Sequence, residues 1–94
     1  MTASELVTAG WTQGAMARKA DNTPCDALDP EAKLFSITGA IIRAYPENFA
    51  EMYHKLYEAN ECLNLKNGKF MLDFNDAPLT TKEVVLEALK RAGM

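Results

Sequence analysis

Residues 29–45 (DPEAKLFSITGAIIRAY) decide the fold, because they predict a buried central helix. Asp29 can cap such a helix, Pro30 suits its first position, and Glu31 complements the positive end of the helix dipole. From residue 34 to residue 45 apolar side chains fall on nearly every face, which is typical of a helix enclosed by its neighbours. We therefore expect the rest of the chain to pack around this helix.

Small residues recur every four positions along the predicted central helix, with a glycine beside them. They are Ala32, Ser36, Ala40 and Ala44, and the glycine is Gly39. Glycine inside a helix costs about 1 kcal/mol relative to alanine. Its presence therefore predicts that a neighbouring backbone approaches the helix closely at this point.

Two further helices flank the central one in the sequence. Near the start of the chain, Thr2 and Glu5 have the spacing of a capping box, and Gly10 predicts a left-handed ending. After residue 45, Pro46 breaks the central helix and begins the next. One apolar stripe follows it at helical spacing, and its members are Phe49, Met52, Tyr53, Leu56, Tyr57 and Leu63.

The last predicted helix is bounded by clear signals at both ends. Thr80 and Glu83 have the spacing of a second capping box, and Leu79 and Val84 stand at the two positions of a hydrophobic staple. Gly93 predicts the end of the helix.

Two segments predict short strands. Residues 15–19, followed by the turn residues 21–24, predict either a weak hairpin, in which Pro24 ends the pairing, or an extended loop. Residues 65–74 contain Asn67-Gly68 and alternating apolar residues, which predict a ribbon by itself or a strand paired with residues 15–19. The fold class expected is therefore α+β: one domain over residues 1–94, with about four helices and a small two-stranded ribbon around a buried central helix.

Composition excludes several classes of function. The chain has 94 residues, 48% hydrophobic and 24% charged, and a formal net charge of −3. Such a chain offers no broad positive field for nucleic acid or anionic lipid. Residues 1–10 lack the basic and apolar regions of a signal peptide, and no apolar run is long enough to span a membrane. Cys25 and Cys62 have no CxxC spacing, which favours reduced thiols in the cytoplasm and leaves open whether the two approach each other.

No complete catalytic or metal-binding pattern is present. Glu51 and His54 form a single E-x-x-H motif, but His54 is the only histidine, so a solvated helix face explains the motif better than a metal site. Cysteine catalysis would require Cys25 or Cys62 beside His54, which spacing cannot establish. We predict no catalytic residue, no metal and no cofactor, and we favour a protein that is not an enzyme.

Two sets of residues are candidates for binding. The first could contact a ligand or a protein partner, and it consists of Trp11, Gln13, Arg43, Tyr53, Tyr57, Asn75 and Asp76. The second could contact nucleic acid, and it consists of the cations Arg18, Lys19, Lys66 and Lys69.

Five stretches together resemble a family of small bacterial and phage proteins catalogued as a domain of unknown function. They are GWTQGA (10–15), DPEA (29–32), GAIIRA (39–44), FNDAP (74–78) and TTKEVV (80–85). The family tends to have Trp where Phe74 stands, and often a Trp-Cys pair where this chain has Phe35-Ser36. The resemblance implies a compact, cytoplasmic, stand-alone domain, and it contributes no catalytic residue.

The preferred function is a protein-interaction module, an adaptor or a modulator, acting as a monomer or a homodimer. Size, acidic balance and the lack of a catalytic set favour it, and a patch formed by Tyr45, Phe49, Tyr53 and Tyr57 is its expected contact surface. One alternative is a nucleic-acid-binding accessory protein. Another is a small-ligand binder or enzyme around Trp11, Gln13, Asn75 and Asp76.

Overall fold

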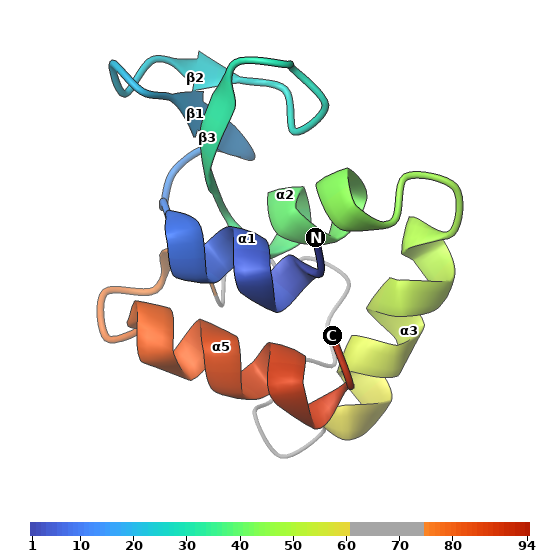
Figure 1. Ribbon diagram of the computed structural model, residues 1–94. Helices are drawn as coiled ribbons and strands as arrows, with labels where there is room; N and C mark the ends of the chain where they lie inside the picture. The colour runs from blue at the N-terminus through green and yellow to red at the C-terminus, as the bar shows by residue number, and fades with distance from the viewer. Residues whose placement is uncertain (61–74) are drawn as a thin grey trace.

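Three short antiparallel strands form a sheet at one end of the molecule. The computed structural model describes residues 1–60 and 75–94. In it β1 (Ala17–Lys19) lies between β2 (Pro24–Cys25) and β3 (Ala32–Phe35). Figure 1 shows the sheet above a layer of helices, so the chain has the expected α+β class.

The hairpin predicted from residues 15–24 is confirmed, but the sheet has three strands rather than two. Asn22 adopts a φ of 74° in the turn, a conformation that asparagine tolerates. Pro24 does not end the pairing, because it lies within β2 opposite Arg18. β2 is an edge strand, where a residue without an N–H is accepted. The ribbon predicted from residues 65–74 lies outside the described residues.

The central helix begins later than the sequence predicts. Residues 32–35 form the strand β3, and α2 (Ile37–Ala44) starts after Ser36, which is its N-cap. Asp29 does not cap a helix; its carboxylate accepts the N–H of Glu31 at 2.8 Å and stabilises a turn. The strand forms here because residues 32–35 pair with β1, a contact that no local sequence pattern reveals.

The first helix, α1 (Ala3–Ala9), has the predicted capping box. The Thr2 N–H donates to the Glu5 carboxylate at 2.8 Å, and the Glu5 N–H donates to the Thr2 hydroxyl at 3.2 Å. These bonds favour the ionised carboxylate and so lower the pKa of Glu5.

Gly10 ends α1 for a different reason than the one predicted. Its φ is −175°, an extended backbone and not a left-handed one. A Cβ at this position would lie 2.6 Å from Leu34 Cδ2 and 2.7 Å from the Lys33 carbonyl oxygen. The glycine is therefore required by the close approach of β3.

The two remaining described helices also start later than predicted. α3 (Phe49–Ala59) begins three residues after Pro46, and α5 (Lys82–Arg91) is capped by Thr81, whose hydroxyl accepts the N–H of Val84 at 3.3 Å. Thr80 is not the cap; it precedes the cap, and its N–H closes a turn onto the Ala77 carbonyl at 3.0 Å. The predicted hydrophobic staple is also absent, since Leu79 is 92% exposed.

The end of α5 is closed as the sequence predicts. Gly93 has a φ of 77°, its N–H donates to Lys90 O at 3.0 Å, and the Met94 N–H donates to Leu89 O at 2.9 Å. This pair of bonds is a Schellman motif. Met94 O in turn accepts the Ser4 N–H at 3.0 Å, which joins the end of α5 to α1.

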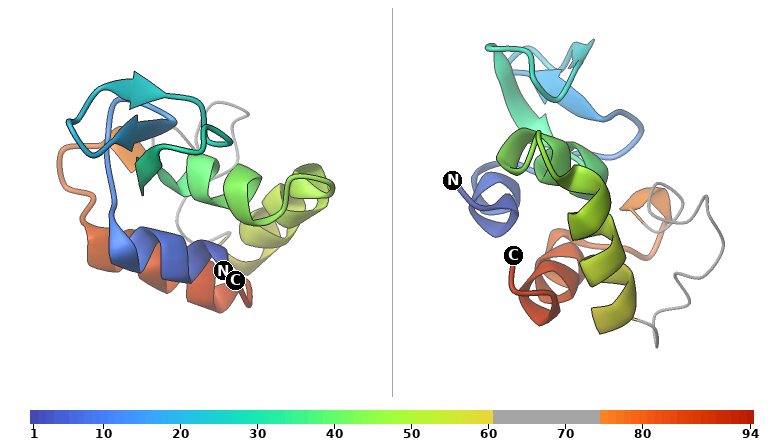
Figure 2. Two further views of the ribbon diagram at one scale, coloured as in Figure 1. Left: turned by 45° about the horizontal axis from the view of Figure 1, so that its top comes forward. Right: turned by 90° about the vertical axis from the view of Figure 1, so that its right-hand side faces the viewer.

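One hydrophobic core lies between the helices and the sheet. α1 packs on α2 and α5, and α3 packs on α5 and α2; Figure 2 shows α1 and α5 side by side. The largest fully buried apolar side chains in the described residues are Ile37, Ile41, Leu56, Leu89, Val7 and Val85. Within residues 1–60 and 75–94, no helix is both long enough and apolar enough to cross a membrane.

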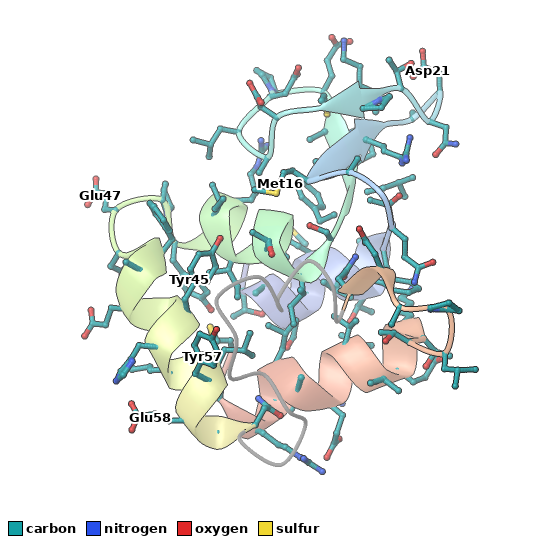
Figure 3. The ribbon with its side chains drawn as sticks, turned by 180° about the vertical axis from the view of Figure 1, so that it is seen from behind. Met16, Asp21, Tyr45, Glu47, Tyr57 and Glu58 are labelled. Atoms are coloured by element: carbon teal, nitrogen blue, oxygen red, sulfur yellow. The ribbon has the colours of Figure 1, made fainter. Side chains whose placement is uncertain are left out.

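The close backbone approach predicted at Gly39 is confirmed. A Cβ on Gly39 would lie only 1.9 Å from the Met16 carbonyl oxygen. That carbonyl belongs to the segment entering β1, and it accepts the N–H and the hydroxyl of Ser36 at 3.0 Å each. Figure 3 shows Met16 where the sheet meets α2. Gly39 therefore lets the sheet rest directly on the central helix.

Gly39→Ala tests this contact. Helix propensity alone would stabilise the protein by about 1 kcal/mol, whereas the clash with Met16 O predicts a loss of about 3 kcal/mol in the free energy of unfolding. Gly93→Ala is the control, because no atom lies within 4 Å of its Cβ position and only its φ of 77° opposes the change. Urea unfolding followed by circular dichroism should show the larger loss at Gly39; an equal loss at both positions would contradict the account.

Candidate functional site

Asn75 lies at the centre of a hydrogen-bonded cluster that joins segments far apart in the sequence. Its side chain has no exposed surface. Asn75 Oδ1 accepts the Trp11 indole N–H at 2.8 Å and the Ile37 backbone N–H at 2.9 Å. Asn75 Nδ2 donates to Thr12 O at 3.0 Å and to Asp76 Oδ1 at 2.9 Å. Both amide donors and both lone pairs of the acceptor are therefore used.

The loop of residues 10–14 contributes three further bonds to this cluster. Gln13 Nε2 donates to Asn75 O at 2.9 Å and to Ala77 O at 3.2 Å. The Gly14 N–H donates to Asp76 Oδ1 at 3.0 Å. We call this set the asparagine clamp, and its side chains are those of Trp11, Gln13, Asn75 and Asp76.

The hydrogen bonds of the clamp account for the positions of all four side chains, so no ligand is needed to explain them. Four of the predicted binding residues do converge, but they converge on one another and on backbone groups. Leaving a buried amide unpaired costs about 1–3 kcal/mol for each unsatisfied group, so a fully paired one is a strong structural contact. Asp76 is the exposed member, and its Oδ1 accepts two of the bonds.

Arg43 does not belong to the clamp, because it lies in the last turn of α2, whereas Asn75 binds the first residue of that helix. Its Nη1 donates to Ala27 O at 3.1 Å and to Asp29 O at 2.7 Å, and its guanidinium carbon lies 6.0 Å from the centre of the Phe35 ring. Arg43 thus holds the 26–31 turn against α2. It also lines a groove of about 380 Å³ between α1 and β3.

Tyr53 and Tyr57 lie on α3, on neighbouring turns. Tyr53 is half-buried, and its ring meets Phe49 edge-on with ring centres 5.6 Å apart. Burial raises the pKa of Tyr53 to about 12 and also raises the pKa of Tyr57, so both phenols are neutral at physiological pH. Neither tyrosine belongs to the clamp, so the predicted set divides among three places in the fold.

The described cations of the nucleic-acid alternative are engaged in internal contacts. Arg18 donates to Thr12 Oγ1, Gln13 O and Asn22 O at 2.9–3.2 Å. Lys19 forms an ion pair of 3.6 Å with Glu31. Lys66 and Lys69 lie outside the described residues.

The remaining titratable candidates stay apart from one another. His54 is exposed and pairs with Glu58 at 3.0 Å on the surface of α3. Cys25 carries a free thiol in β2, and partial burial raises its pKa. Among residues 1–60 and 75–94, no three His, Cys, Asp or Glu side chains are grouped to hold a metal ion. Cys62 lies outside the described part of the chain.

The sequence profile of one protein family matches this chain over residues 1–93, and the family is described as one of unknown function. The chain belongs to that family, DUF6197. No curated protein and no solved structure matches the chain. The family membership confirms the resemblance found in the sequence, and the match covers all four side chains of the clamp.

Sequence reasoning identified the members of the clamp but missed what joins them. The Ile37 N–H is a partner of Asn75 that no motif predicts, because the helix was expected to start several residues earlier. The local sequence gives little signal, because Asn75 follows Phe74 but has Asp73 and Asp76 close to it in the chain. Buried polar groups need partners, which is a reason to look for unsatisfied helix N–H groups nearby.

Asn75→Asp tests the clamp. The substitution replaces the donor of Asn75 by an oxygen that faces Thr12 O and Asp76 Oδ1, so we expect a loss of at least about 3 kcal/mol in the free energy of unfolding. Trp11 is the only tryptophan, so its fluorescence reports on the clamp during urea unfolding.

Asp76→Asn is the matched control for that experiment. It exchanges the same two side-chain types at the neighbouring, exposed position and leaves an acceptor oxygen for the Gly14 N–H. We expect it to cost no more than about 1 kcal/mol. Equal losses for the two variants would contradict a central role for the buried amide.

Proposed function

We propose that this protein is a non-enzymatic protein-interaction module whose contact surface is an aromatic corner where α2 turns into α3. The corner consists of the exposed Phe49 together with Tyr45 and Tyr53, which are partly buried against the core. The observation that carries the proposal is the position of Phe49, which exposes 40% of its surface at the first residue of α3. Exposed aromatic side chains that cluster are typical anchors of protein interfaces.

The surroundings of Phe49 suit a binding surface. Tyr53 packs edge-on against it at 5.6 Å and holds its ring, and the neutral Tyr53 hydroxyl is available as a donor at physiological pH. The turn before α3, residues 46–48, is exposed. In Figure 3 Tyr45 points to the inner side of α3, while Glu47 projects outward from the turn.

The charge at this corner indicates the chemistry of the partner. Glu47 and Glu51 are exposed on either side of Phe49, and the chain as a whole carries a net charge of −3. We infer a protein partner with an apolar pocket bordered by Lys or Arg side chains. We place the module in the cytoplasm, and the resemblance to small phage proteins supports a modulator of a host protein as a special case.

Nucleic-acid binding is the weaker proposal. Arg18 and Lys19 would have to leave their internal partners to contact phosphates. Salt distinguishes the two proposals, because phosphate contacts weaken steeply as ionic strength rises, whereas an apolar anchor does not.

Phe49→Asp tests the aromatic corner in the full chain. Tagged wild-type and variant proteins are incubated with native lysate at low and high salt, and the retained proteins are quantified by mass spectrometry. We expect a protein near equal stoichiometry that wild type retains at high salt and that Phe49→Asp loses. The loss should be roughly 30-fold in affinity, the effect of removing an anchor worth about 2 kcal/mol.

Leu79→Asp is the matched control, since Leu79 is more exposed than Phe49. It belongs to the segment before α5, drawn in orange in Figure 1, and that segment lies at the opposite side of the molecule from α3. This variant should retain the partner. Equal capture by wild type and Phe49→Asp, or no protein captured by wild type, would contradict the proposal. Nucleic acid recovered only at low salt would favour the alternative.

A further inference from the structure

The groove between α1 and β3 combines an apolar floor with positive charge. It has a volume of about 380 Å³, within the range of small-ligand pockets, and eight residues line it. They are Met1, Leu6, Ala9, Pro30, Ala32, Lys33, Phe35 and Arg43. Two of them are cations and none is an acid, although acidic residues outnumber basic ones in the whole chain.

The nearby carboxylates are engaged elsewhere. Glu5 caps its own helix through Thr2, and Glu31 pairs with Lys19 of β1. The Asp29 carboxylate accepts the Glu31 N–H. The two cations that line the groove therefore have no acidic partner among the described residues, which leaves a positive site in an acidic protein.

Arg43 is held in place by one side of its guanidinium only. Its Nη1 makes both of its hydrogen bonds to the described residues, donating to the carbonyls of Ala27 and Asp29. Nε and Nη2 make no hydrogen bond within residues 1–60 and 75–94. The Phe35 ring, 6.0 Å from the guanidinium carbon, supports the group from one face. A guanidinium fixed in this way offers its remaining N–H groups to a carboxylate without losing further side-chain freedom.

We propose that this groove binds a small carboxylic acid with an apolar body. The carboxylate would lie against Arg43 and Lys33, and the apolar body would cover Leu6, Ala9 and Phe35. The two cations favour a ligand with a carboxylate, and the apolar residues of the groove favour a ligand whose remaining atoms are apolar. The groove is built by α1, β3 and α2 and shares no residue with the aromatic corner, so this site and the proposed function stand or fall separately.

Octanoate is the probe, titrated into the full-length ¹⁵N-labelled protein and followed by NMR chemical shifts. We expect saturable shifts confined to α1, β3 and Arg43, with a Kd on the order of 1 mM, as suits a ligand of this size. 1-Octanol and octylamine carry the same tail without the carboxylate, and each should bind at least about 10-fold more weakly.

Four variants test the groove and allow a loss of binding to be distinguished from a loss of folding. Lys33→Gln changes an exposed side chain and should weaken octanoate several-fold, and Ala9→Phe should fill the groove and abolish binding. Arg43→Gln should weaken binding about 10-fold, and its unfolding is measured in parallel because Arg43 also holds the 26–31 turn. Lys55→Gln removes an exposed cation from α3 and should change nothing.

Three results would overturn the proposal. The first is the absence of saturable shifts with octanoate. The second is binding that 1-octanol reproduces or that Ala9→Phe leaves unchanged. The third is tighter binding by a short peptide ending in a leucine carboxylate than by octanoate, which would assign the groove to a protein chain instead.

Discussion

The buried side-chain amide of Asn75 is the contact on which the rest of the structure depends. The start of α2 is buried, so water cannot satisfy its free N–H groups, and two side chains do so instead: Asn75 for Ile37 and Ser36 for Gly39. The same Asn75 oxygen accepts the Trp11 indole. One amide therefore sets where α2 begins and anchors the loop of residues 10–14.

Position along the chain makes this contact important. Asn75 lies 64 residues from Trp11 and 38 from Ile37, so it closes long loops that local structure cannot close. The contact also acts together with two glycines. Gly10 admits β3 beside the end of α1, and Gly39 admits the backbone of Met16 onto α2. A polar centre and two sites of close backbone approach thus join the sheet to the helices.

Local signals in the sequence predicted local structure well. The capping box of Thr2 and Glu5, the turn around Asn22 and the ending at Gly93 depend on neighbouring residues only, and all are present. Most of the errors arise where distant pairing decides; the exception is the start of α5, where Thr80 and Glu83 have the spacing of a capping box but Thr81 is the cap. Residues 32–35 have apolar content that suits a helix, but pairing with β1 makes them a strand. Similarly, Trp11 and Asn75 were recognised as candidates, while their mutual bond depends on a fold that spacing does not encode.

The two proposals assign recognition to residues other than those of the asparagine clamp. Trp11, Gln13 and Asn75 are used to hold the fold, whereas Phe49 on α3 and Arg43 on α2 leave apolar surface and N–H groups available to other molecules. In the most distinctive motif, GWTQGA, the side chains of Trp11 and Gln13 both donate hydrogen bonds to Asn75. The sequence singled out Trp11, Gln13 and Asn75 as binding candidates, and the structure shows that their side chains bond within the fold instead.

Hydrogen exchange at the Ile37 amide tests the central role of Asn75 most directly. If the amide oxygen of Asn75 holds this N–H in the core, it should exchange only when the whole protein unfolds, as slowly as the amide of buried Leu89 in α5. NMR of the protein transferred into heavy water measures both rates. Exchange of Ile37 at the rate of an exposed loop amide, while Leu89 remains protected, would contradict the account.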